Sequence, residues 1–140
     1  MKLEMDEFGS ALYYSSLAGI QEVSDYLLKK GENANTKGGN LGNPLQAASC
    51  SGHEAIVKVL LENGAEVNAM GGEYGYALQA ASASYNGNEA IVKVLLENGA
   101  EVNAMGGEYG YGLQAASYIR KRGISFSTAF NSFQQLSILL

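Results

Sequence analysis

The chain of 140 residues repeats part of itself, and this repetition limits its possible folds more than any other feature. Residues 54–82 match residues 89–117 at an offset of 35, and the 29 aligned positions differ only where Ala77 is replaced by Gly112. A second offset, of 33 residues, relates the earlier part of the chain to the same unit. Periods of this length are typical of solenoids built from stacked supersecondary units. The sequence predicts one domain, residues 1–140, with repeats at about 8–37, 38–70 and 71–105 and a degenerate C-terminal repeat at 106–140.

Local signals predict two helices in the second repeat. Asn43 is a good N-cap and Pro44 suits the first helical position, so a helix is expected over about 44–51, with Gly52 at its end. A second helix is expected over about 54–62. The sequence therefore predicts a helix-turn-helix unit in each repeat and an all-α fold.

The second helix reads EAIVKVLLE and carries only a narrow polar stripe, formed by Glu54, Lys58 and Glu62. A helix on the outside of a single core would show a broader polar face, so this helix is expected to be covered on several sides. Glu54 and Lys58 are four residues apart and are expected to pair on the exposed line. A lone repeat would leave much of its apolar area in water, so the repeats must stack to be stable.

Charge and composition exclude several classes of partner and cofactor. The net charge of -5 disfavours nucleic acid and anionic membranes, because both would be repelled at long range. Cys50 is the only cysteine and His53 the only histidine, so neither a disulfide nor a Cys/His zinc cluster is expected. No secretory signal or 18-residue apolar run is present. We expect a soluble protein in the cytoplasm, with the nucleus as a second possibility, and no cofactor or metal.

The segment 110–115, GYGLQA, matches the dinucleotide fingerprint G-x-G-x-x-A. That fingerprint works between a strand and a helix of a parallel βαβ unit, with an acidic residue about 20 positions further on. No Asp or Glu follows Ala115, and the sister repeat has Ala77 in place of the second glycine. The glycines are better explained by a tight turn between repeats.

The repeats resemble the ankyrin family. Three segments follow the family pattern T-P-L-H-x-A, G-H-x-x-I-V and L-L-x-x-G-A-x-x-N-A, namely 43–48, 52–57 and 60–69. The motif G-x-A-L-Q-A-A-S is similar to a variant found in fungal ankyrin-repeat arrays. The resemblance implies helix-turn-helix units joined by finger-like hairpins at right angles to the helices. It also implies that partner proteins bind on the fingers and on the inner face of the first helices.

The resemblance assigns partner-facing positions to the fingers and to the ends of the first helices. On the fingers they are Met70, Gly72, Glu73, Gly75, Met105, Gly107, Glu108 and Gly110. At the ends of the first helices they are Cys50, Ser51, Ala83, Ser84 and the inserted Tyr85. The chain departs from the family where a capping threonine is replaced by Tyr76 and Tyr111, so those two helix starts are expected to be less secure.

Other chemistry-bearing residues have a structural explanation that we favour. His53 has no matched nucleophile or orienting carboxylate, and Asn88 replaces it in the next repeat. Cys50 has no cationic neighbour in sequence and is interpreted as an inert filler. Tyr74 and Tyr109 occupy a position held by Phe8 in the first repeat, which favours packing over partner contact. Residues 118–140 lack the family pattern and form either a divergent capping helix or a frayed tail.

These observations predict a non-catalytic protein-interaction module, binding another protein as a monomer. Two other classes stay open. One is a fragment or sensor region of a larger fungal receptor of the NACHT and ankyrin type. The more remote one is a nucleotide-dependent enzyme that uses the loop at Gly110.

Overall fold

The computed structural model describes residues 8–83, 88–101, 105–106 and 110–111. Within these ranges the chain forms three helix pairs and one short ribbon of two strands. The elements, in chain order, are α1 (Ala11–Ala18), α2 (Gln21–Lys29), α3 (Pro44–Ser51), α4 (Glu54–Glu62), α5 (Ala77–Ala83), α6 (Glu89–Glu97), β1 (Met105–Gly106) and β2 (Gly110–Tyr111).

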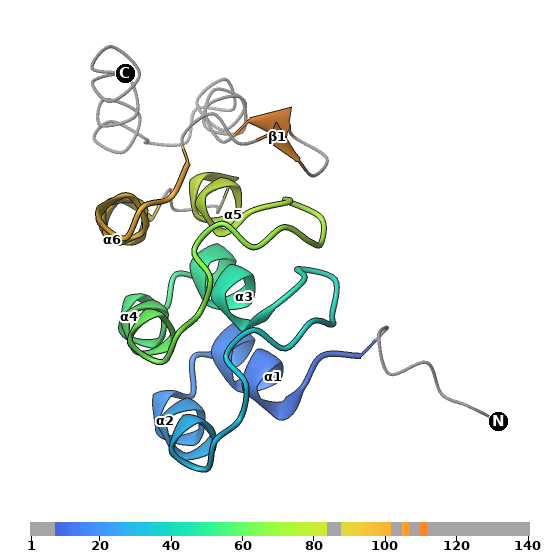
Figure 1. Cartoon of the computed structure of the whole chain (residues 1–140), viewed down its shortest axis with the longest axis vertical. Helices are drawn as coiled ribbons and strands as arrows, with labels where there is room; N and C mark the ends of the chain where they lie inside the picture. Colours follow the sequence, from blue (N-terminus) through green and yellow to red (C-terminus); the bar gives the residue numbers. More distant parts are fainter. Residues whose placement is uncertain (1–7, 84–87, 102–104, 107–109, 112–140) are drawn as a thin grey trace, which may run out of the picture.

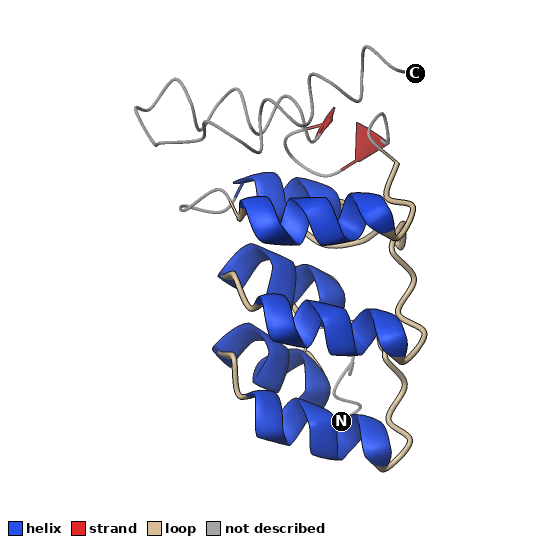
Figure 2. Cartoon of the chain, turned by 90° about the vertical axis from the view of Figure 1, so that its left-hand side faces the viewer, coloured by secondary structure: helices blue, strands red, loops and turns tan. Residues whose placement is uncertain are grey.

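The helix pairs stack in a row, as a solenoid requires (Figure 1). The first helices α1, α3 and α5 form one column, and the second helices α2, α4 and α6 form the other. The view from the side shows the three pairs as successive layers (Figure 2). The connections from α2 to α3 and from α4 to α5 extend beyond the column of first helices as fingers. The predicted all-α solenoid is confirmed in this architecture.

Local capping explains where the first helices begin and end. The side chain of Asn43 accepts a hydrogen bond of 2.8 Å from the backbone N–H of Gln46, and Pro44 occupies the first turn. Gly52 ends α3 in the left-handed conformation at φ 84°. Such a conformation costs glycine little, because it has no Cβ. The predicted bounds of both helices in the second repeat are confirmed.

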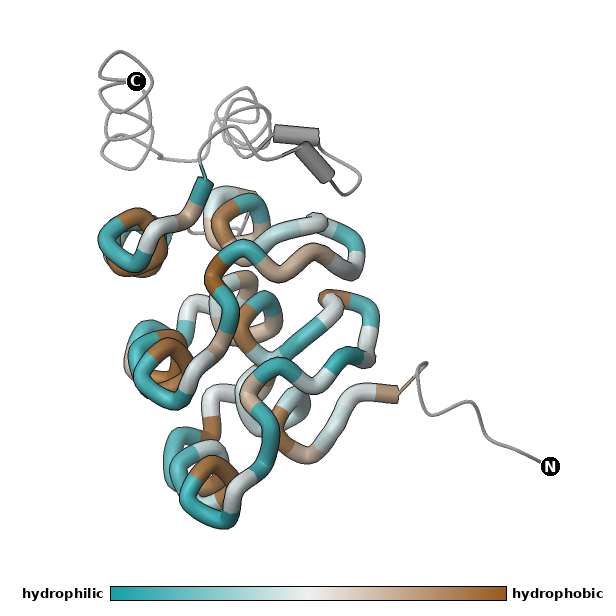
Figure 3. The backbone as a smooth tube through the Cα atoms, viewed as in Figure 1, coloured by the Kyte–Doolittle hydropathy of each residue, from teal (hydrophilic) through white to brown (hydrophobic). Residues whose placement is uncertain are grey.

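The core lies between the two columns, where the hydrophobic residues of successive layers meet (Figure 3). In the second repeat, Leu45, Ile56, Val57 and Leu60 are buried, and their equivalents in the third repeat are buried too. The exposed face of α4 is broader than the predicted one-residue stripe, because Ala55 is also exposed. Alanine tolerates this position because its small side chain leaves little apolar area in water.

The predicted pairing on α4 is present. Lys58 Nζ lies 2.8 Å from Glu54 Oε1, and both side chains are largely in solvent. An exposed pair at this spacing adds little to helix stability, because solvent screens the two charges.

The strands β1 and β2 form a two-residue antiparallel ribbon, in which Met105 faces Tyr111 and Gly106 faces Gly110. The ribbon is the third finger. Its antiparallel pairing differs from the parallel βαβ unit that a dinucleotide fingerprint requires. The predicted capping helix or tail at 118–140 and the helix start after Tyr111 lie outside the described residues.

Candidate partner-binding surface

Each finger is closed by the same pair of glycines. The backbone N–H of Gly38 donates to the carbonyl of Gly42 at 2.9 Å, and the N–H of Gly71 donates to the carbonyl of Gly75 at 2.8 Å. The equivalent pair in the third finger is Gly106 and Gly110, which face each other in the β1–β2 ribbon. The recurrent glycines are therefore structural elements of the fingers.

Glycine also allows successive fingers to stack backbone against backbone. Gly72 has φ 70°, and a Cβ at this position would collide with the carbonyl group of Leu41 in the finger below. A Cβ on Gly42 would likewise meet the carbonyl carbon of Gly71 at 2.8 Å. The N–H of Glu73 donates to the carbonyl of Asn40 at 3.0 Å across the same contact. The two fingers are thus held together by their main chains.

A buried side chain of α1 and one of α3 anchor the fingers that follow these two helices. Gln46 is fully buried, and its Nε2 donates to the carbonyl of Gly75 at 2.8 Å. In the first repeat Tyr13 occupies the equivalent position, and its hydroxyl accepts a hydrogen bond of 3.1 Å from the N–H of Leu41. Both residues perform the same task with opposite hydrogen-bonding roles. Sequence analysis did not detect this anchor, although the 33-residue offset places Tyr13 and Gln46 at one position.

One asparagine in each of the connections after α2 and α4 ties that connection to the next repeat. Asn35 donates from Nδ2 to the carbonyl of Gly64 at 2.9 Å and accepts from the N–H of Glu66 at 2.7 Å. Asn68 makes the same two contacts one repeat later, with the carbonyl of Gly99 at 3.0 Å and the N–H of Glu101 at 2.9 Å. Sequence analysis did not use this pair either, although Asn35 and Asn68 are separated by one period.

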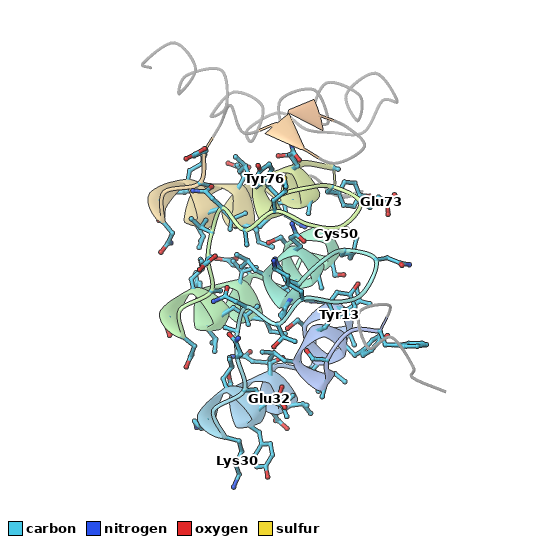
Figure 4. The ribbon with its side chains drawn as sticks, turned by 45° about the vertical axis from the view of Figure 1, so that its right-hand side comes forward. Tyr13, Lys30, Glu32, Cys50, Glu73 and Tyr76 are labelled. Carbon is cyan, nitrogen blue, oxygen red and sulfur yellow. The ribbon has the colours of Figure 1, made fainter. Side chains whose placement is uncertain are left out.

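The predicted contact residues of the second finger differ in their exposure to solvent. Met70 has 64% of its surface exposed, and Gly72 and Glu73 are exposed as well. Gly75 is buried at the base of the finger, where its carbonyl accepts the hydrogen bond from Gln46, so it is not a surface position. Figure 4 shows Glu73 at the outer edge of the finger.

The predicted residues at the ends of the first helices also differ in exposure. Ser51 is exposed, whereas Cys50 and Ala83 are partly buried. Met105 and Gly110 lie in the strands of the third finger. The remaining predicted positions lie outside the described residues, namely Ser84, Tyr85, Gly107 and Glu108.

Cys50 lies nearer to the helix column than Glu73 (Figure 4). Partial burial raises the pKa of its thiol, and the negative charge of Glu73 raises this pKa further, while a hydrogen bond with the Tyr74 side chain lowers it. A raised pKa leaves less thiolate at neutral pH. The environment of Cys50 therefore disfavours nucleophilic chemistry.

His53 connects two repeats. Its Nε2 lies 3.2 Å from the carbonyl oxygen of Leu17, at the end of the preceding first helix. Asn88, which replaces His53 in the next repeat, donates from Nδ2 to the carbonyl of Ser49 at 3.1 Å. In the part of the chain that the structure describes, no group of three His, Cys, Asp or Glu residues is placed to hold a metal ion. A structural role for His53 agrees with its hydrogen bond.

A shallow pocket of about 240 Å³ lies between the first two fingers. Its eleven lining residues include five glycines, together with Lys37, Glu66 and Met70. The volume is below the range of about 300 to 1,000 Å³ that is usual for small-molecule sites.

None of the helices in the described ranges has the length and apolarity that a bilayer-spanning segment needs.

The sequence comparisons agree with the fold. Residues 2–71 and 42–106 match the family model of ankyrin repeats (three copies), and together these segments cover most of the chain. The chain therefore belongs to the ankyrin-repeat family. Proteins with this fold typically act as non-catalytic scaffolds that bind other proteins.

Among solved structures, the chain is similar to the ankyrin repeat domain of human ASB11. The two chains share 30% sequence identity with a TM-score of 0.74, over 90% of this chain and 53% of that one. The chain thus spans about half the length of that domain. A search of curated proteins finds no significant match. These similarities are to ankyrin repeats in general, and the fungal-type resemblance stays a prediction.

Proposed function

We propose that this chain is a non-catalytic interaction module that binds a partner protein through its fingers and the adjoining ends of its first helices. The observation that carries the proposal is the exposure of Met70 and Glu73 on a finger whose backbone is anchored from below. A rigid display of this kind lowers the ordering cost of binding, because the contact residues are already in place.

The chemistry of the finger favours a protein partner over a nucleic acid. Met70 offers a flexible apolar contact, and Glu73 adds a negative charge beside it. The net charge of -5 would repel phosphate groups at long range, whereas it would attract a basic segment of a partner protein. Nucleotide binding at Gly110 gains no support, because the strand that precedes it pairs antiparallel.

Affinity capture from the source cell tests this proposal. The parent chain is compared with a variant that carries Met70→Asp and Met105→Asp, and the bound proteins are quantified. A partner that uses the fingers should lose most of its binding to the double variant, because each substitution places a charge where an apolar contact is needed.

The matched control is Ala55→Asp, which adds the same charge to an exposed position on α4, away from the fingers. This control should retain the parent level of binding. Equal capture by the parent and the double variant, with both chains folded by circular dichroism, would contradict binding at the fingers.

A further inference from the structure

The end of the stack formed by α1 and α2 exposes an apolar face. Tyr14, Ile20, Val23 and Tyr26 are large apolar or aromatic residues at this end, and all four are exposed, Tyr26 by 59%. Figure 1 shows α1 and α2 as the layer at one end of the row, with α3 and α4 on one side only. We call these four residues the end face.

The residues at equivalent positions in the next repeat are buried against the preceding repeat. Tyr14 aligns with Ala47 at an offset of 33, and Val23 aligns with Ile56. Tyr14 and Val23 are 48% and 41% exposed, whereas Ala47 and Ile56, which have a repeat before them, are 0% and 1% exposed. Tyr14 and Val23 therefore occupy the positions that, in the next repeat, pack against the preceding repeat. Tyr14 is larger than its equivalent Ala47.

The end face includes two tyrosines, Tyr14 and Tyr26, which are 48% and 59% exposed. Tyrosine combines a large apolar contact area with a polar group, and it is enriched at protein interfaces. The composition of the end face is that of an interface.

The charges of α2 indicate which partner fits. Glu22 lies in its first turn and Asp25 at its midpoint, whereas Lys29 is its last residue and Lys30 its C-cap. Lys30 Nζ lies 5.5 Å from the centre of the Tyr26 ring, so a positive charge lies at the edge of the end face. Figure 4 shows Lys30 at this free end of the stack.

A two-fold axis beside α2 would place α2 of a second copy antiparallel to α2 of the first copy. The acidic beginning of each helix would then lie beside the basic end of the other, with Glu22 near Lys30 of the second copy, twice by symmetry. The three charged residues of α2 and its C-cap Lys30 together sum to zero, so the net charge of the whole chain does not oppose this contact locally. We propose that the end face binds a second copy of this chain and forms a two-fold dimer.

The dimer departs from the monomer expected from the sequence, and it goes beyond the proposed function because it uses a different surface. The fingers lie beside the column of first helices and stay free. Two sets of fingers in one assembly would bind a divalent or repetitive partner more tightly than a single set does.

Sedimentation velocity of the full chain over a wide range of concentration tests the proposal. The parent should pass from monomer to dimer as its concentration rises. Val23→Glu and Tyr26→Glu should each weaken dimerisation at least about tenfold, because they place a charge in the apolar contact. The control Ala55→Glu adds the same charge to α4 and should dimerise like the parent.

A charge exchange separates this pairing from any general effect on folding. Glu22→Lys and Lys30→Glu should each dimerise more weakly than the parent, because like charges would face each other. An equimolar mixture of these two variants should recover a dimer, since the opposite charges again meet across the axis. The melting temperatures of the dilute variants, measured alongside, report folding separately.

A parent chain that stays monomeric at the highest concentration reached would overturn the proposal, as would a Tyr26→Glu variant that dimerises like the parent. A monomeric parent would indicate instead that the end face is covered by another segment of the chain or by a different partner. Failure here leaves the finger assay unaffected, because that assay depends on Met70 and Met105.

Discussion

At the scale of single residues, two glycines in the connection after α4 have different roles, Gly64 at the end of the helix and Gly72 in the finger. Gly64 and Gly72 both have positive φ, 87° and 70°, but only Gly72 has a neighbouring finger against it. A Cβ on Gly64 would meet nothing within 4 Å, whereas one on Gly72 would collide with Leu41. Substitutions at Gly64 and Gly72 therefore distinguish the cost of backbone strain alone from the added cost of a clash between fingers.

We predict that Gly64→Ala lowers the free energy of unfolding by about 1 kcal/mol, the cost of a left-handed alanine. Gly72→Ala should cost at least about 2 kcal/mol, because overpacking against the finger below adds to that strain. Urea denaturation followed by circular dichroism measures both values. Equal losses in the two variants would mean that the fingers do not rest on each other.

A second prediction at this scale concerns the thiol of Cys50. Burial and the charge of Glu73 both raise its pKa, so it should react more slowly with a thiol reagent at pH 8 than the thiol of the unfolded chain. Glu73→Gln removes one negative charge, which should lower the pKa of Cys50 and speed the reaction. The gain should be partial because burial is the larger cause.

Reaction rates of the folded chain with a disulfide reagent across a pH series check this prediction. Glu66→Gln is a suitable control, because Glu66 does not contribute to the pKa shift of Cys50. A Glu73→Gln variant with the parent rate at every pH would show that the finger does not lie close to Cys50 in solution.

At the scale of the elements, the second helices carry much of the core. Leu60 is fully buried in α4, and its neighbour Leu61 is only partly buried. Leu60→Ala should lower the free energy of unfolding by roughly 2 to 5 kcal/mol, through lost transfer energy and a cavity. Leu61→Ala should lower it by roughly 1 kcal/mol, because part of its side chain is already in water.

Chemical denaturation of both variants gives these values. A Leu60→Ala variant as stable as Leu61→Ala would contradict the stacked arrangement of the second helices.

The helices were predictable because their signals are local. Asn43, Pro44 and Gly52 act within one turn of the helix that they begin or end, so α3 and α4 were predicted with the bounds that they have. The exposure of Ala55 was not predictable, because the width of the outer face depends on how closely neighbouring layers approach.

At the scale of the whole molecule, the repeats differ in how many neighbours they have. Among the described residues, the pair α3 and α4 is covered by helices on both sides, whereas α1 and α2 have a helical layer on one side only. In a solenoid, stability is a sum of repeat terms and nearest-neighbour interfaces, so the inner layer should open less often.

We predict slower amide hydrogen exchange in α4 than in α2, measured by mass spectrometry on a dilute sample. At high concentration the exchange of α2 should slow selectively if the end face dimerises, while that of α4 should change little. Uniform protection of α2 and α4 in the dilute chain would indicate that the molecule opens as a single unit.

The exposure of the predicted partner-facing positions could be read only in part from the sequence. Met70 and Glu73 are exposed as the family resemblance implied, while Gly75 is buried. The anchors Gln46 and Tyr13 could not be recognised, because each bonds a backbone group 28 or 29 residues further along the chain. A linear pattern shows that a position recurs, but it does not show which distant carbonyl or N–H lies within reach.

The sequence by itself determined the period, through the match of the chain with itself, and it determined the bounds of α3 and α4 and the all-α class, because caps and apolar spacing act within a single repeat. The tertiary structure decided how the fingers rest on each other, which predicted contacts reach the surface, and that Tyr14 and Tyr26 lie uncovered at the end of the row. These features depend on the distance between layers, which is set by packing of side chains far apart in the chain.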